Sequence, residues 1–133
     1  MTVKRFKLRP GMAKPGWDDP DDCRAVLKVL DRIGDKWTVM AVGALADGPM
    51  RFNAILRLTG ASHRMLTLTL RALEGDGLVK RTAYATIPPK VEYELTRLGL
   101  SLIEPLQGIA TWAQRNRRAM ETARAKFEAA KAG

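Results

Sequence analysis

Residues 51–75 read RFNAILRLTGASHRMLTLTLRALEG. This stretch predicts two short helices joined by a tight turn, because apolar residues recur at helical spacing on both sides of Thr59-Gly60-Ala61. The first helix is expected over residues 51–58, with Phe52, Ile55 and Leu58 facing inward. Ser62 is a suitable N-cap for the second helix, which is expected to end at Gly75. Two helices joined in this way form the basic unit of a helix-turn-helix.

The second helix of this pair has two chemically different faces. Three leucines spaced for one side are expected to pack on the neighbouring helices. The other side is suited to the major groove of DNA, because arginine can donate two hydrogen bonds to guanine and threonine can contact phosphate or a thymine methyl group. The inward set is Leu66, Leu70 and Leu73, and the outward set is Arg64, Thr67, Leu68 and Arg71. We therefore predict a DNA-reading helix; the alternative is a basic face that is only solvated.

Two more helices are predicted before this unit. Asp22 can cap a helix that starts near Cys23, carries apolar residues at helical spacing and ends at Gly34. Asp35 can cap the next helix, and Asp47-Gly48-Pro49 forms a turn after it.

After residue 77 the apolar period changes from helical to alternating. Residues 78–84 suit one strand, and residues 91–95 suit a second, half-buried strand. Ile87-Pro88-Pro89 lies between them and is expected at the tip of a hairpin, because proline cannot donate a ladder hydrogen bond. Thr96 can cap a final helical region, with a kink expected at Pro105.

The order of these elements predicts an α+β fold that is mostly α. It is the order of a winged helix-turn-helix with N- and C-terminal dimerisation helices. We divide the chain into a flexible N-terminal arm over residues 1–20, the winged domain over residues 21–115, and a C-terminal helical tail over residues 116–133. The arm is either a disordered tail or a segment that touches DNA phosphate or a partner subunit.

The chain is strongly basic, with a net charge of +9 over 133 residues. Such a charge favours polyanionic partners, above all nucleic acid. Hydrophobic residues make up 46% of the chain, which is enough to build a folded core. Basic residues bracket the predicted hairpin and the predicted helix-turn-helix. The side chains expected to hold DNA phosphate are His63, Lys36, Arg51, Lys80, Arg81 and Lys90.

Several motifs together resemble the HxlR-type transcriptional regulators. The resemblance starts with Ile33-Gly34-Asp35-Lys36-Trp37 and Gly48-Pro49-Met50-Arg51-Phe52-Asn53. It continues through the leucines and arginines of residues 62–81, then through Tyr84, Pro88-Pro89 and residues 91–99, and covers roughly residues 23–115. The chain departs from the family pattern at Cys23-Arg24, where the family often has Cys-Pro, and at Gly34-Asp35, where it has two glycines.

The resemblance implies a bacterial or archaeal regulator that binds palindromic double-stranded DNA operators as a homodimer. It also implies that the first helix and the C-terminal helices form the dimer interface. In this sequence those helices carry Val26, Leu27, Leu30, Leu102, Ile103, Leu106, Ile109 and Trp112. In part of the family a cysteine at the position of Cys23 senses quinones, aldehydes or disulfide stress.

Cys23 is the chain's single cysteine. A thiol at a helix start beside Arg24 is expected to be reactive, but the aspartates at positions 18, 19, 21 and 22 oppose this effect. We favour an unreactive, partly buried cysteine over a redox sensor. Trp37 and Trp112 are expected to pack in the core or the dimer interface; the alternative is that they line a pocket for a small-molecule effector.

We therefore predict a sequence-specific DNA-binding transcriptional regulator, a repressor or activator according to promoter geometry. The alternative is a winged-helix module that binds other proteins and does not bind a specific DNA sequence. No catalytic set of residues is recognisable, so we predict that the chain is not an enzyme, and no cofactor or metal site is expected. The sequence shows neither a signal peptide nor an apolar span for a membrane, which favours the cytoplasm.

Overall fold

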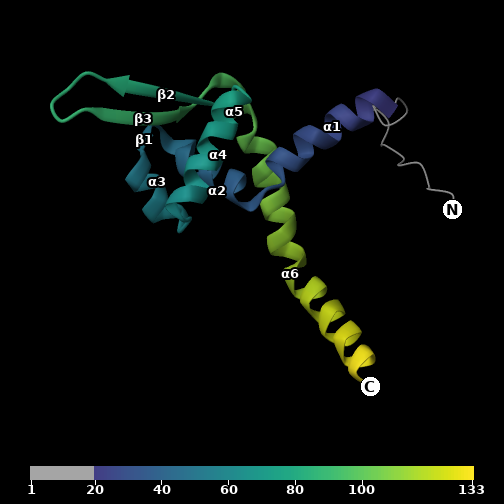
Figure 1. The fold of residues 1–133 in the computed structure, drawn as a ribbon. Coiled ribbons are helices and arrows are strands. Elements are labelled where there is room, and N and C mark those ends of the chain that lie inside the picture. The colour runs from purple at the N-terminus through teal and green to yellow at the C-terminus, as the bar shows by residue number, and fades with distance from the viewer. Residues whose placement is uncertain (1–19) are drawn as a thin grey trace. The chain divides into compact units, whose positions relative to one another are not determined.

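The computed structural model describes residues 20–133, so the predicted arm lies almost wholly outside the described residues. The chain divides into one unit up to Asp35 and a second from Lys36 to Gly133, and each is described by itself. The described residues are mostly helical, with one small antiparallel sheet (Figure 1). In chain order the elements are α1 (Pro20–Ile33), α2 (Lys36–Ala44), the 3-10 helix η2 (Leu45–Asp47), β1 (Met50–Arg51), α3 (Phe52–Thr59), α4 (His63–Gly75), β2 (Val79–Tyr84), β3 (Lys90–Leu95), α5 (Arg97–Ser101) and α6 (Ile103–Ala132).

Helix α1 starts at Pro20, a little before the predicted start near Cys23. Proline is well placed there because a first-turn N–H has no carbonyl to bind within the helix. The negative charges of Asp21 and Asp22 stabilise the same end, where the helix dipole is positive. Gly34 ends the helix as predicted, and its N–H donates to the carbonyl of Leu30 at 2.7 Å. No residue of α1 is buried.

The core of the second unit lies between α2, α4 and the sheet. The predicted inward leucines Leu66, Leu70 and Leu73 are each no more than 1% exposed, which confirms the register of α4. They pack with Ala41 and Val42 of α2. Because this packing fixes one face of α4, the opposite face is held outward.

Helix α3 differs from its prediction by one residue at each end and in one inward position. Leu58, expected to face inward, is 64% exposed, whereas Thr59 is buried. Thr59 lies one full turn after the buried Ile55, and its hydroxyl donates to the carbonyl of Ile55 at 2.9 Å. A buried threonine is therefore accommodated because its polar group is satisfied within the helix.

The sheet contains the predicted hairpin and one strand that was not predicted. Strands β2 and β3 pair antiparallel from Val79↔Leu95 to Tyr84↔Lys90. The two-residue β1 pairs with β3 at Met50↔Tyr93, so the strand order is β1-β3-β2. Because side chains alternate along a strand, Arg81 and Tyr93 lie on the face toward α4 and Lys80 on the other face.

Thr96 is the N-cap of α5, as predicted. Its hydroxyl accepts from the N–H of Gly99 at 3.1 Å and donates to the carbonyl of Gly77 at 2.6 Å. The helix breaks at Leu102 rather than at the predicted Pro105, which lies in the first turn of α6. Proline fits there because first-turn N–H groups have no carbonyl to bind. None of the helices among residues 20–133 is both long and apolar enough for a membrane span.

Candidate DNA-binding surface

Helices α3 and α4 form the predicted helix-turn-helix. The chain leaves α3 through Gly60, whose φ of 70° is left-handed and whose N–H donates to the carbonyl of Leu56 at 3.0 Å. Glycine is favoured at this point because it adopts that conformation without steric cost. Ser62 then caps α4: its hydroxyl oxygen accepts from the N–H of Met65 at 3.1 Å. The turn and the cap together fix where α4 starts.

The outward face of α4 carries the residues that the sequence assigned to base reading. Arg64 and Arg71 are exposed, and Leu68 is 53% exposed. Within residues 20–133 neither arginine forms an ion pair, so both guanidinium groups keep their donors for a ligand. Thr67 is half-buried, and its hydroxyl donates to the carbonyl of His63 at 2.8 Å. Towards a ligand Thr67 therefore offers its methyl group and oxygen lone pairs.

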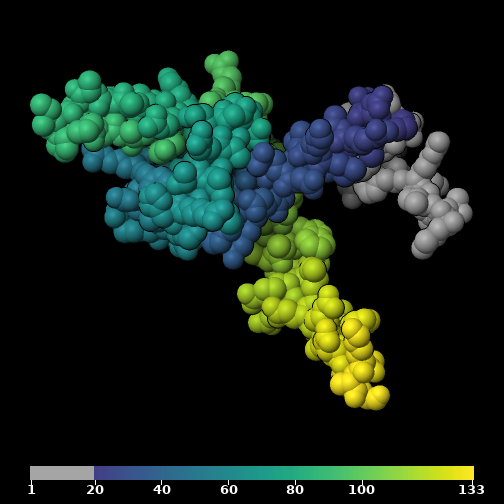
Figure 2. Space-filling view, in the orientation of Figure 1, coloured from purple at the N-terminus to yellow at the C-terminus, as the bar shows by residue number. Residues whose placement is uncertain are grey.

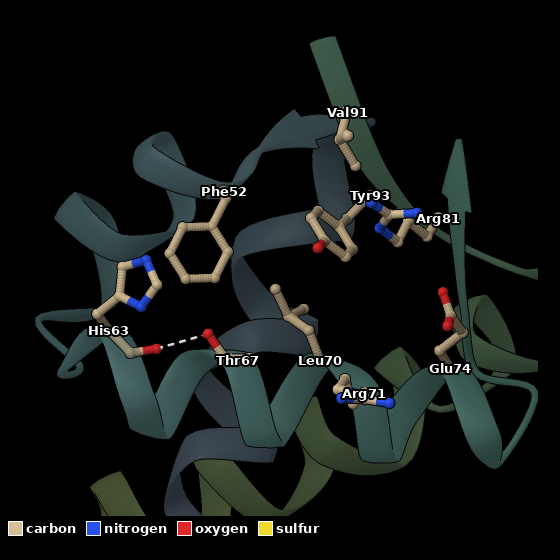
Figure 3. Close-up of a pocket in the computed structure, with 9 residues that line it drawn as sticks. All are labelled: Phe52, His63, Thr67, Leu70, Arg71, Glu74, Arg81, Val91 and Tyr93. Carbon is tan, nitrogen blue, oxygen red and sulfur yellow. Dashed lines mark hydrogen bonds between the residues drawn. The ribbon is translucent and has the colours of Figure 1, made fainter. Parts of the chain in front are cut away.

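A groove of about 570 Å³ separates α4 from the sheet, and we name it the α4 groove (Figure 3). Its walls combine an apolar base with charged side chains at the edge. The ring of His63 lies 4.7 Å from the ring of Phe52, tilted by 50°, so this histidine flanks the start of the groove. The lining residues are Phe52, His63, Thr67, Leu70, Arg71, Glu74, Arg81, Val91 and Tyr93.

The structure brings some of the predicted phosphate-binding residues together and separates others. His63 and Arg81 line the α4 groove with Thr67 and Arg71. Lys80 is exposed on the opposite face of the hairpin, where it pairs in register with Glu94. Lys36, at the start of α2, does not line the α4 groove, and its ammonium group lies 4.8 Å from the centre of the Trp37 ring.

Arg51 and Lys90 lie together beside the start of α3. Lys90 pairs with Glu92 at 3.1 Å, and its ammonium group lies 4.6 Å from the centre of the Tyr84 ring. Arg51 and Lys90 line a second groove, at the start of α3, together with Arg57. No role was predicted for Arg57, because a basic residue on the outer side of a short helix cannot be told from a solvated one by its spacing.

In Figure 2 the atoms of α4 and of the hairpin form one continuous surface within the second unit. The surface thus combines an exposed helix face with a β-hairpin. An α-helix of this kind fits the major groove of DNA, and the guanidinium groups supply hydrogen-bond donors to base edges.

The residues assigned to the dimer interface fall into two groups. Leu102, Ile103 and Leu106 are partly buried against the core of their own chain. By contrast, Ile109 and Trp112 on α6 are 62% and 57% exposed. On α1, Val26 is half-buried, while Leu27 and Leu30 are 46% and 42% exposed.

Cys23 lies in the first turns of α1 and is partly exposed. The neighbouring Arg24 contacts Asp21 at 3.9 Å, and both side chains are largely exposed, so this ion pair adds little stability. Within residues 20–133 no group of three or more His, Cys, Asp or Glu side chains is placed to hold a metal ion.

Comparison with known proteins identifies the family. The HxlR-like helix-turn-helix profile matches residues 32–121. The HTH-type transcriptional regulator YybR of Bacillus subtilis is 43% identical over 96 residues, covering 71% of this chain and 77% of its own. The solved structure of the transcriptional regulator YtfH from Salmonella typhimurium is 36% identical with a TM-score of 0.67, covering 75% of this chain and 90% of that one. The redox regulator HypR in its reduced form is 41% identical with a TM-score of 0.68, covering 74% and 98%. The chain belongs to the HxlR-like helix-turn-helix family of transcriptional regulators.

Proposed function

We propose that this regulator binds a palindromic double-stranded DNA operator as a homodimer and reads its bases with the outward face of α4. The observation that carries the proposal is an exposed basic face, with Arg64 for base edges and Arg71 for phosphate, on a helix whose opposite face is buried in the core. The promoter position of the operator then decides between repression and activation. A regulator of this kind acts where the DNA is, which in a bacterial or archaeal cell is the cytoplasm.

The side chains of α4 divide into two roles. Arg64 and Leu68 lie away from the α4 groove, and we assign them to base edges: the guanidinium group to guanine and the leucine to a thymine methyl group. Thr67 and Arg71 line the groove together with Arg81. We assign these three to the sugar-phosphate strand that runs between the major groove entered by α4 and the minor groove reached by the hairpin tip.

The exposed apolar stripes support a homodimer. Helix α1 presents the exposed Leu27 and Leu30 beside the half-buried Val26, and α6 presents Ile109 and Trp112. Large apolar side chains gathered on a helix face are a common feature of subunit interfaces. A two-fold dimer would place its two α4 helices about 34–36 Å apart, one turn of DNA.

The test is selection of bound fragments from random duplexes at stated salt, followed by measurement of Arg64→Ala. The variant should lose about 1–3 kcal/mol of discrimination between operator and random DNA in each half-site, or about 2–6 kcal/mol over the proposed dimer. Arg97→Ala is the matched control, because Arg97 is exposed and lines neither groove. An unchanged ratio of operator to random affinity in Arg64→Ala would remove the base-reading role of this arginine.

The same assay tests the other parts of the proposal. Loss of all duplex binding near physiological salt would favour a protein-interaction module. A HypR structure is described as that of a redox regulator in its oxidised form, so oxidants and electrophiles belong among the effectors to be added to the assay.

A further inference from the structure

A second groove, of about 640 Å³, lies where α3 begins, and we name it the α3 groove. It exists because β1 is only two residues long. β1 pairs with β3 at Tyr93 and Glu92, so the edge of β3 at Lys90 and Val91 has no partner from β1. The lining residues on which the argument depends are Arg51, Phe52, Asn53, Arg57, Lys90 and Val91.

The α3 groove is lined by three basic side chains and by no acidic one. Of the three, Lys90 is paired with Glu92. Arg51 and Arg57 are exposed and form no ion pair within the described part of the chain. The groove therefore carries a net positive charge and two guanidinium groups whose donors remain free for an anion.

Other donors line the same groove. Asn53 contributes a side-chain amide. Arg51 occupies the N-cap position of α3 and its side chain makes no capping hydrogen bond, so the first-turn N–H groups are left without a side-chain acceptor. Amide and backbone N–H groups of this kind are usual partners of phosphate oxygens.

The α3 groove adjoins the α4 groove. Phe52 and Val91 line both, so these two side chains form the wall between them. Basic residues thus follow one another across this part of the second unit, from Arg71 and Arg81 on one side of the wall to Arg51 and Arg57 on the other. An extended polyanion fits such a track better than a small anion does, because its successive phosphates can occupy both grooves.

We propose that the α3 groove holds a backbone phosphate of the bound duplex, and that Arg57 is a DNA-contacting residue of this protein. The proposal rests on the proposed function and adds a contact from the first helix of the helix-turn-helix to those from α4 and the hairpin. A phosphate contact positions the duplex and contributes affinity without regard to base sequence.

Arg57→Gln tests the proposal in the full chain, with Arg97→Gln as a control that removes the same charge outside both grooves. Each neutralised phosphate adds about 0.9 to the slope of log affinity against log salt. Because the proposed homodimer carries two Arg57 side chains, the slope should change by about 1.8, and between 50 and 200 mM salt the wild-type affinity should fall about 12-fold more than that of Arg57→Gln. Arg97→Gln should keep the wild-type slope, and thermal unfolding should show that both variants are folded.

Duplexes with single uncharged methylphosphonate linkages locate the contact. A linkage at the contacted phosphate should weaken binding of the wild type. The same linkage should leave binding of Arg57→Gln unchanged, because this variant already lacks the side chain that contacts the phosphate. The proposal is overturned if Arg57→Gln and Arg97→Gln behave alike on every duplex while the wild type still prefers its operator. If the wild type shows no preference for any duplex over random DNA, the proposed function fails and this contact fails with it.

Discussion

Leu66 and Leu68 lie two residues apart on α4, yet replacing each with alanine should have opposite consequences. Leu66 is 1% exposed and packs in the core, whereas Leu68 is 53% exposed. Leu66→Ala removes three buried carbons, worth about 2.4 kcal/mol at about 0.8 kcal/mol each. The cavity left behind adds to this loss, so we expect the free energy of unfolding to fall by about 3 kcal/mol, within the usual range of about 2–5 kcal/mol.

Leu68→Ala should change the free energy of unfolding by less than about 0.5 kcal/mol, because the side chain is half in water and alanine is a slightly better helix former. The two variants should therefore differ by at least about 2 kcal/mol, or about 30-fold in the folding equilibrium constant. Leu68→Ala should instead weaken operator binding, since we assign this side chain to a base contact.

Urea titration of the full chain measures the free energy of unfolding of both variants, with tryptophan fluorescence and circular dichroism as the two signals. All samples need the same protein concentration, because the stability of the proposed homodimer would depend on it. Equal losses of stability in Leu66→Ala and Leu68→Ala, or a larger loss in Leu68→Ala, would refute the register of α4 and with it the outward placement of the arginines.

Three further predictions concern the helix ends and the cysteine. Ser62→Ala should cost about 1 kcal/mol of stability, because one first-turn N–H of α4 loses its acceptor, and Ser62→Thr should keep most of the wild-type stability in the same titration. Gly99→Ala should cost about 1–3 kcal/mol of stability, because the added Cβ would overlap the backbone carbonyl of Leu78. Gly108→Ala, whose Cβ would meet nothing inside α6, should instead raise stability by up to about 1 kcal/mol, and equal effects would contradict this packing. Cys23 should react with an alkylating reagent no faster than free cysteine, and diamide should leave operator affinity unchanged; fast alkylation together with oxidant-dependent binding would instead establish a sensor.

Several elements of the fold were predictable because their pattern is local. The leucines of α4 recur every three or four residues, and Val91, Tyr93 and Leu95 alternate with charged residues. The cap at Ser62 was likewise predictable, because serine directly before a helical pattern is a preferred N-cap residue.

The features that were missed depend on partners distant in the sequence or on which of two neighbouring residues faces the core. β1 is too short to show a period and exists because β3 pairs with it. Thr59 is buried instead of Leu58 because its hydroxyl has an acceptor one turn earlier, which a hydrophobicity pattern does not register. In the sequence Arg57 looked like any solvated helix residue. Only the folded hairpin places Lys90 in the same groove as Arg57.

The geometry separates specificity from affinity in a way that can be measured. Arg64 lies on the outward face of α4 and lines neither groove, whereas Arg71, Arg81 and Arg57 each line one. Because base edges differ between sequences and phosphates do not, loss of Arg64 should change the ratio of operator to random affinity. Loss of a groove arginine should lower both affinities together and reduce the salt slope. An Arg71→Gln variant that changed the ratio as strongly as Arg64→Ala would place Arg71 among the base readers and leave the α4 groove to Arg81 and His63.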